Sequence, residues 1–212
     1  MIQVYKTKNE INFMVSGKTY QDITEWTSSV DEMVFREQLA TGRFGNNIEL
    51  DPDTLALMRH VEKQGGILPY YGLGGSSGVC TYRFRVTTSR IQLTVEHGTT
   101  HRVMSLDTPL EISEKSASMK GRRFKFSPFP HLIKEKLPQE WSGESPEALV
   151  CKITGREYEK LVKWPKWVDT QALSERYEYS FSEVSIGATG FVAKIKDTKS
   201  NDLIDVTDYD DW

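Results

Sequence analysis

The sequence predicts an α+β fold that consists mainly of antiparallel β-sheet with three to five short helices. First, residues 80–86 and 91–97 alternate apolar and polar side chains with a period of two, as half-buried antiparallel strands do. Second, similar runs recur near both ends of the chain, and third, helix-start signals separate them. Strong curvature of the sheet or its closure into a barrel stays open.

Length and composition are those of one globular domain. The chain has 212 residues, of which 38% are hydrophobic and 27% are charged, so it can bury a core of normal size. We expect a single domain over 1–212. A candidate subdomain boundary lies at 138–147, where Pro, Ser and Gly residues cluster.

Two features of the sequence favour a cytoplasmic protein without a membrane partner. No apolar run approaches the roughly 18 residues of a membrane-spanning helix. The first 17 residues have the pattern of two strands and a turn rather than that of a secretory signal. Cys80 and Cys151, the only cysteines, both lie in strand-like runs, so we expect buried free thiols rather than a disulfide.

Alternating or apolar runs predict strands along the whole chain, besides the central hairpin. In chain order they are 2–5, 11–15, 122–126, 148–153, 177–181, 191–195 and 203–206. The alternation of 177–181 slips in phase near 182–183, which indicates a β-bulge there. The last run is expected to pair back on the strand before it.

Two helices are predicted before the central hairpin. Ser29 with Glu32 forms a capping-box pattern ahead of an apolar stripe, and Gly42 is placed to end that helix. Asp51 followed by Pro52 is a strong start signal, because Asp caps the first turn and Pro fits the first helical position. This second helix is expected to stop at the glycines 65–66.

Two more helices are predicted in the second half of the chain. A short helix is expected at 131–137, after the prolines that end the strand at 122–126. Thr154 with Glu157 forms another capping box, which predicts a helix that runs to about Lys163.

His97 and His101 are the candidate catalytic residues. If the strand that ends at His97 pairs with one that begins at His101 across a three-residue loop, the two imidazoles face each other about 5 Å apart at Cβ. In that register both lie on the face opposite Arg83 and Arg85. Such a pair could share a proton or bind a metal, but spacing places no third ligand nearby, so we predict no metal and no cofactor. The alternative is a pair of polar residues at the rim of a hairpin.

Four basic residues are candidates for binding an anion. Arg83 and Arg85 lie two apart on one predicted strand and project together, as do Arg123 and Lys125 on another. A sheet face that gathers them could bind phosphates. Solvated side chains of an ordinary sheet are the alternative. Nucleic-acid binding is possible but not favoured, because the net charge is −3 and no aromatic residues interleave with the arginines.

Aromatic residues near the end of the chain are candidate partner-binding anchors. Trp164 and Trp167 follow the last predicted helix, and interfaces favour tryptophan. They could equally be buried hinge residues. Tyr209 and Trp212 belong to an acidic tail, which could dock in the basic groove of a partner, dock on the basic segment 115–136 of this chain, or complete a strand.

Together these features favour a non-enzymatic binding protein that engages a protein partner, or a second copy of itself, through aromatic anchors and a charged sheet face. One alternative is an enzyme that processes a phosphate ester or a nucleotide in a cleft lined by arginine and histidine. A second alternative is a nucleic-acid-binding protein. The sequence contains no nucleophile elbow and no phosphate-binding loop, so the enzyme alternative depends on residues that only the fold could bring together.

Overall fold

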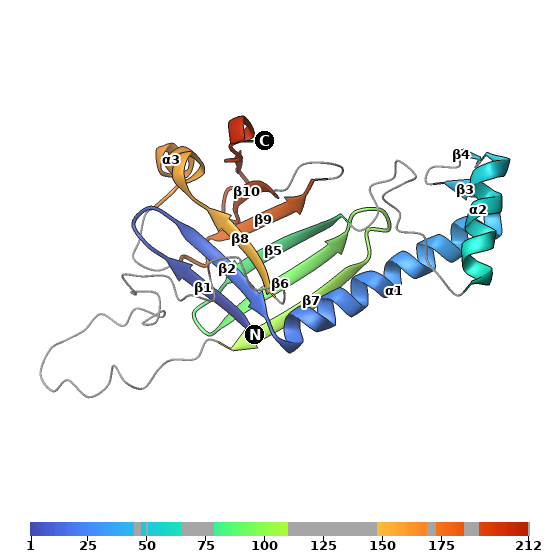
Figure 1. The fold of residues 1–212 in the computed structure, drawn as a ribbon. Coiled ribbons are helices and arrows are strands. Elements are labelled where there is room, and N and C mark those ends of the chain that lie inside the picture. Colours follow the sequence, from blue (N-terminus) through green and yellow to red (C-terminus); the bar gives the residue numbers. More distant parts are fainter. Residues whose placement is uncertain are drawn as a thin grey trace, which may run out of the picture.

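The alternating runs of the sequence form two antiparallel sheets. A computed structural model of the chain describes residues 1–44, 48–49, 51–64, 79–109, 148–168, 173–184 and 191–211. These residues form a three-stranded sheet, a six-stranded sheet, a two-stranded ribbon and three α-helices (Figure 1). The predicted α+β class with antiparallel sheet is confirmed.

The smaller sheet has the strand order β1-β2-β8 and the larger sheet has the order β11-β10-β9-β5-β6-β7. In chain order the strands are β1 (Ile2–Lys6), β2 (Ile11–Ser16), β3 (Arg43–Phe44), β4 (Ile48–Glu49), β5 (Cys80–Val86), β6 (Arg90–His97), β7 (Val103–Pro109), β8 (Ala148–Ile153), β9 (Tyr177–Glu183), β10 (Phe191–Asp197) and β11 (Leu203–Asp205). Strands β7 and β11 are the two edges of the larger sheet, so the described strands form no closed barrel.

Phe13, in the middle of β2, joins the two sheets. Its ring stacks on Phe84 with centroids 4.4 Å apart, and it lies 5.1 Å from Tyr179 and 5.7 Å from Phe181. All four side chains are fully buried. Because side chains alternate along a strand, every second residue of β5, β6, β9 and β10 points into this layer. We call this side of the larger sheet the inner face and the opposite side the outer face.

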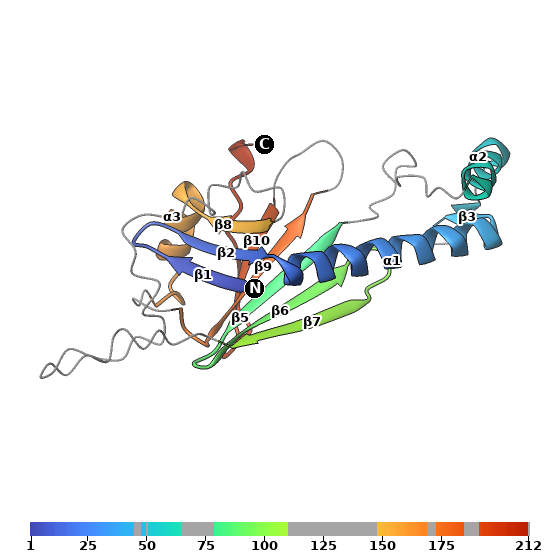
Figure 2. The ribbon, with the colours of Figure 1, turned by 60° about the horizontal axis from the view of Figure 1, so that its bottom comes forward.

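The helices are α1 (Lys18–Thr41), α2 (Pro52–Lys63) and α3 (Gly155–Lys163), and a 3₁₀ turn, η5 (Tyr209–Asp211), lies near the end of the chain. Helix α1 packs Ile23 and Trp26 against the core and then projects beyond both sheets (Figures 1 and 2). Helix α2 lies at its far end, where Phe35, Leu39 and Met58 form a second, smaller cluster. The expectation of short helices fails for α1, which has 24 residues.

Helix α1 begins eleven residues before the predicted capping box. Gly17 has a φ of 57° and turns the chain directly from β2 into the helix, with no side chain that caps the first turn. Ser29 lies inside the helix, and Glu32 pairs there with Arg36 at 2.6 Å. The predicted end is confirmed, because Gly42 adopts the left-handed conformation with a φ of 64° and its N–H bonds to the carbonyl of Gln38.

The other described helices begin as predicted. Asp51 accepts a hydrogen bond from the Thr54 N–H, and Pro52 occupies the first position of α2. Thr154 and Glu157 form the expected capping box of α3, which ends at Lys163. The predicted helix at 131–137, the glycines 65–66, the strand at 122–126 and the boundary at 138–147 lie outside the described residues.

The predicted hairpins are confirmed, with one difference in β9. Strand β5 pairs with β6 from Cys80 opposite His97 to Val86 opposite Ile91, and β11 pairs back on β10. Strand β9 keeps a regular register with both neighbours through Ser182, so the predicted bulge is absent from the described ladder. The phase slip coincides instead with the end of β9 at Glu183.

The contact of Phe13 with three aromatic rings predicts a large loss of stability on truncation. We expect Phe13→Ala to lower the free energy of unfolding by about 3–5 kcal/mol, because it leaves a cavity between the sheets. Urea unfolding followed by circular dichroism measures this loss. Lys8→Ala, in the exposed turn between β1 and β2, is the control and should change the free energy by less than about 0.5 kcal/mol. Equal losses would contradict the assigned core.

Candidate functional site

The outer face of the larger sheet carries polar side chains in rows that cross the strands. One row consists of Lys196, Glu178, Arg85, Gln92 and Asp107, and the next consists of Lys194, Ser180, Arg83, Thr94 and Ser105. Residues directly opposite in such rows lie about 5 Å apart at Cβ. The smaller sheet and α1 both lie on the inner side, and no described element covers the outer face (Figure 2).

Basic side chains gather in the middle of the outer face. Arg83 and Lys194 lie on either side of Ser180, and Arg85 and Lys196 lie on either side of Glu178. Four positive charges and the one carboxylate of Glu178 give a local balance of 4 − 1 = +3. Arg85 is exposed and forms no ion pair with any described residue. This group, which we call the basic cluster, can bind carboxylates or phosphates.

Arg83 is connected to one of the two predicted histidines. Its guanidinium donates to the carboxylate of Glu96 at 2.5 Å, and Nδ1 of His101 donates to the other oxygen of that carboxylate at 2.9 Å. These hydrogen bonds, from His101 first and then from Arg83, hold the pKa of Glu96 below its usual value. The side chain of His101 is 78% exposed. Glu96 therefore joins a predicted arginine and a predicted histidine at the border of the basic cluster.

His97 and His101 do not face each other, contrary to the prediction. The loop between β6 and β7 has four residues, because the His97 N–H bonds to the carbonyl of Arg102, and His101 has a φ of 54°. The predicted three-residue loop is thus one residue too short. A shift of one residue turns a side chain to the other side of a strand. His97 is fully buried on the inner face, whereas His101 is exposed.

Both ring nitrogens of His97 are engaged. Nε2 lies 3.0 Å from a carboxylate oxygen of Asp31 on α1, and the N–H of Thr100 donates to Nδ1 at 3.3 Å. Because Nδ1 accepts, the proton lies on Nε2, which donates to Asp31. The contact joins α1 to β6, and the two residues are 66 positions apart in the sequence.

Cys80 on β5 is paired with His97 on the neighbouring strand β6, but its thiol is not an activated nucleophile. The thiol is 1% exposed, and burial, followed by the nearby Glu183 carboxylate, raises its pKa to about 11. His97 does not serve as its base, because both of its ring nitrogens bond to other described residues, Asp31 and Thr100. Cys80, His97 and Asp31 have the composition of a nucleophilic triad without its geometry.

Glu183, at the end of β9, completes this polar cluster. It accepts hydrogen bonds from the Cys80 N–H and the Tyr82 hydroxyl, each at 2.8 Å, and burial raises its pKa above the usual value. Within the described residues no three His, Cys, Asp or Glu side chains are arranged to hold a metal ion. We therefore interpret the cluster as the polar contact that fixes α1 to the end of the sheet.

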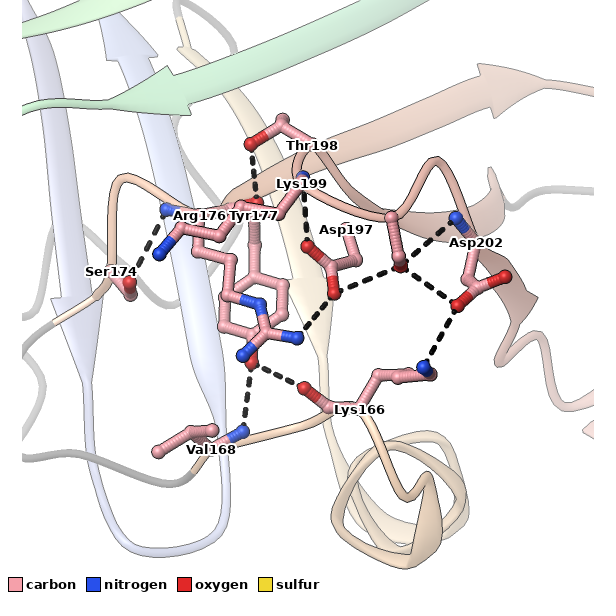
Figure 3. A network of polar contacts seen from close by, with 10 residues as sticks. Lys166, Val168, Ser174, Arg176, Tyr177, Asp197, Thr198, Lys199 and Asp202 are labelled. Carbon is pink, nitrogen blue, oxygen red and sulfur yellow. Dashed lines mark hydrogen bonds and ion pairs between the residues drawn. The ribbon is translucent and has the colours of Figure 1, made fainter.

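The predicted tryptophan anchors pack against the protein itself. Trp167 lies 4.7 Å from the ring of Tyr177, centroid to centroid, and Trp164 lies 6.3 Å from it. The hydroxyl of Tyr177 donates to the carbonyl of Lys166 and accepts from the N–H of Val168 (Figure 3). Both tryptophans are half-buried, so they hold the chain after α3 on the core and offer a partner only part of their surface.

A partly buried ion pair lies beside this aromatic group. Arg176 donates to Asp197 at 2.5 Å, and Ser200 and the Lys199 N–H also donate to the Asp197 carboxylate (Figure 3). Asp197 is fully buried. The hydrogen bond from Arg176 contributes most to holding the pKa of Asp197 well below its usual value. The acidic residue fixes the turn between β10 and β11 and is not free for a partner.

The acidic tail docks on its own chain. Arg156 of α3 lies 3.1 Å from Asp210 and 3.8 Å from Asp208, and the ammonium of Lys160 donates to the Thr207 carbonyl. In the described part of the chain the receiving element is α3. The segment 115–136 lies outside the described residues, so docking of the tail on it stays a prediction. Tyr209 is 54% exposed, and its hydroxyl donates to Asp205 on the outer face.

Three predicted site residues, Arg123, Lys125 and Trp212, lie outside the described residues. Two residues of the basic cluster, Lys194 and Lys196, were not among the predicted ones. The sequence does carry their signal, because Phe191, Ala193 and Ile195 alternate with them along one strand. What the sequence could not indicate is that β9 lies between β10 and β5.

Fold and site together define an α+β protein of two antiparallel sheets with a charged sheet face that no described element covers. Comparison with known proteins finds no family model, no curated protein and no solved structure that matches this chain. The helices of the described part include none that is both long and apolar enough to cross a membrane.

The Asp197–Arg176 pair predicts that stability falls at acid pH. Because the folded pKa of Asp197 is lowered, its contribution is complete above the unfolded value of about 3.9 and is lost as the pH falls below it toward the folded value. We expect Asp197→Asn to be less stable than the wild type at pH 7, with a difference that shrinks between pH 4 and pH 2.5. Urea unfolding at each pH measures it. A constant difference, or the same profile in Glu25→Gln on exposed α1, contradicts this account.

The His97–Asp31 contact predicts that Asp31→Ala lowers the free energy of unfolding by about 1–2 kcal/mol, because a buried N–H loses its acceptor. Amide exchange should speed up in α1 around residue 31, whereas β9 and β10 keep their protection. Long-range ¹H–¹⁵N spectra of the wild type should show the His97 proton on Nε2. His101→Ala is the control and should leave α1 unaffected. A proton on Nδ1 would refute the assigned contact.

Proposed function

We propose that the protein binds an acidic segment of a partner protein on the outer face of the larger sheet and has no catalytic activity of its own. The observation that carries this proposal is the basic cluster, in which two positive side chains on β5 and two on β10 flank the carboxylate of Glu178 on the strand between them, β9. Arg85 has no ion-pair partner among the described residues, so its charge is available to a ligand. Such charges steer encounter and select partners more than they raise affinity.

The composition of the outer face favours a protein over a nucleic acid. Around the basic cluster lie acidic side chains, Glu96, Asp107 and Asp205, so the face has both signs of charge. Nucleic-acid surfaces need a continuous excess of positive charge, and single strands also need aromatic rings on which bases stack. No aromatic residue of the described strands points to the outer face.

Exposed apolar side chains at both edges of the outer face supply contacts of another kind. Val103 of β7 is 53% exposed, and Leu203 of β11 is 58% exposed. Tyr209 is also exposed, and it lies beside Asp205 at the β11 edge. A charged centre with apolar residues at the edges suits a short segment that carries carboxylates between apolar side chains. Tyr209 therefore keeps the proposed role of an aromatic anchor.

The phosphate-ester or nucleotide-processing alternative has less support. His97 lies on the inner face, on the other side of the sheet from Arg83 and Arg85, so of the two histidines only His101, through Glu96, lies near an arginine of the predicted cleft. The proposed cytoplasmic location is supported by Cys80 and Cys151, which are both buried and free of disulfides.

Selection of a displayed random peptide library on the purified full chain tests the proposal. We expect the selected peptides to be rich in Asp and Glu, and a fluorescent copy to bind with an affinity that falls as salt rises. Arg85→Glu/Lys196→Glu should weaken this binding at least about tenfold, because it reverses two charges of the basic cluster. Fluorescence anisotropy measures the dissociation constant.

Arg59→Glu/Lys63→Glu is the matched control, since it makes the same change of charge on α2, far from the outer face (Figure 1). It should bind the peptide as the wild type does. The proposal fails if both double variants lose the same affinity, if selection yields no acidic peptides, or if single-stranded or duplex DNA of 20 nucleotides binds more tightly than the peptide.

A further inference from the structure

Strand β7 presents a row of backbone hydrogen-bonding groups that pair with no described strand. The His97 N–H donates to the carbonyl of Arg102, so that opposite pair is a hydrogen-bonded one. In an antiparallel ladder such pairs alternate with pairs that are not hydrogen-bonded. The backbone groups of Met104, Leu106 and Thr108 therefore point toward β6. Those of Val103, Ser105 and Asp107 point away from the sheet, and these three residues are exposed.

This edge lacks the features that usually prevent two strand edges from pairing. Strand β7 has seven residues, no lysine and no bulge, and its proline, Pro109, stands at the very end. Its one charged residue, Asp107, lies 3.3 Å from Arg90 on β6. The opposite edge, β11, has three residues and is followed by the docked acidic tail. Among the described strands, β7 is therefore the edge of the larger sheet that can accept another strand.

We propose that β7 pairs antiparallel with β7 of a second copy of this chain. Ser105 of one copy lies opposite Ser105 of the other, and Val103 lies opposite Asp107 on both sides of the two-fold axis. These three pairs are the ones whose backbone groups point outward, so each exchanges two hydrogen bonds. A strand that pairs with itself in this way gives a closed dimer, because the same edge is used up in both copies.

Side chains favour this register over its neighbours. A shift of the second copy by two residues in one direction places Pro109, which has no N–H, opposite Val103, and the other direction leaves Asp107 without a partner in the strand. In the proposed register no charged residue faces one of the same sign. Met104 and Leu106, which are half-buried against the core, face Leu106 and Met104 of the other copy on the inner side. The two cores thus become continuous across the axis.

The two-fold axis is perpendicular to the sheet, so the outer faces of both copies point the same way. The dimer would carry two basic clusters on one continuous sheet, and a partner with two acidic segments would gain affinity from both. The pairing itself does not rest on the proposed function. Each of the two hypotheses can fail while the other stands, since one is tested by peptide binding and the other by mass.

Analytical ultracentrifugation of the full chain tests the pairing. We expect a species of twice the 24.3 kDa chain mass at concentrations of tens of micromolar. Ser105→Lys and Ser105→Glu each place two like charges opposite each other at the axis, so each variant alone should be monomeric at these concentrations. Ser105→Thr keeps the charge and the N–H and should remain dimeric. Circular dichroism and thermal unfolding confirm that each variant is folded.

Mixing the two charged variants gives the decisive result. Lysine from one copy then faces glutamate from the other, so a one-to-one mixture should form a heterodimer that neither variant forms alone. Only a self-opposed Ser105 predicts this rescue. A wild-type monomer at 100 μM, a dimer that persists in both charged variants, or a mixture that stays monomeric overturns the proposal.

Discussion

The packing of Phe13 against the inner face of the larger sheet is the contact on which the rest of the fold depends. One aromatic ring from the smaller sheet lies among Phe84, Tyr179 and Phe181, which come from β5 and β9. This contact decides which side of β5 and β9 is inner. It thereby decides that Arg83, Arg85 and Glu178 point outward, because a strand sends successive side chains to opposite faces. The chemistry of the outer face is thus a consequence of the core.

The same constraint explains why the polar groups of the molecule fall into two classes. Polar side chains on the outer face meet water and form mixed-charge rows. Those on the inner face must find partners inside, because an unpaired buried polar group is costly. His97, Asp31 and Glu183 satisfy that requirement at one end of the sheet, and Asp197 with Arg176 satisfies it at the other. The triad-like composition of Cys80, His97 and Asp31 is thus accounted for by the need to pair buried polar groups.

Local patterns predicted most of the elements, since period-two alternation and helix caps act over a few residues. The hairpin of β5 and β6, the Asp51 cap and the Thr154 capping box all depend on such short-range signals. The start of α1 does not, because Gly17 turns the chain through its backbone conformation alone. The prediction placed His97 and His101 on the same face because it made the loop between β6 and β7 one residue too short. The contact of Asp31 with His97, and the adjacency of β9 to β5, arise only from tertiary packing.

Because α1 projects beyond the sheets, the His97–Asp31 contact affects the position of the far end of this helix. Asp31 contacts His97 at the end of β6, and residues 32–41 continue the helix for about 15 Å beyond it, at 1.5 Å per residue. A tilt of about 10° around this point moves the far end of the helix, and α2 with it, by about 3 Å. The hydrogen bond to the buried imidazole therefore adds to the apolar packing of Ile23 and Trp26 in limiting how far the distant end of α1 can move.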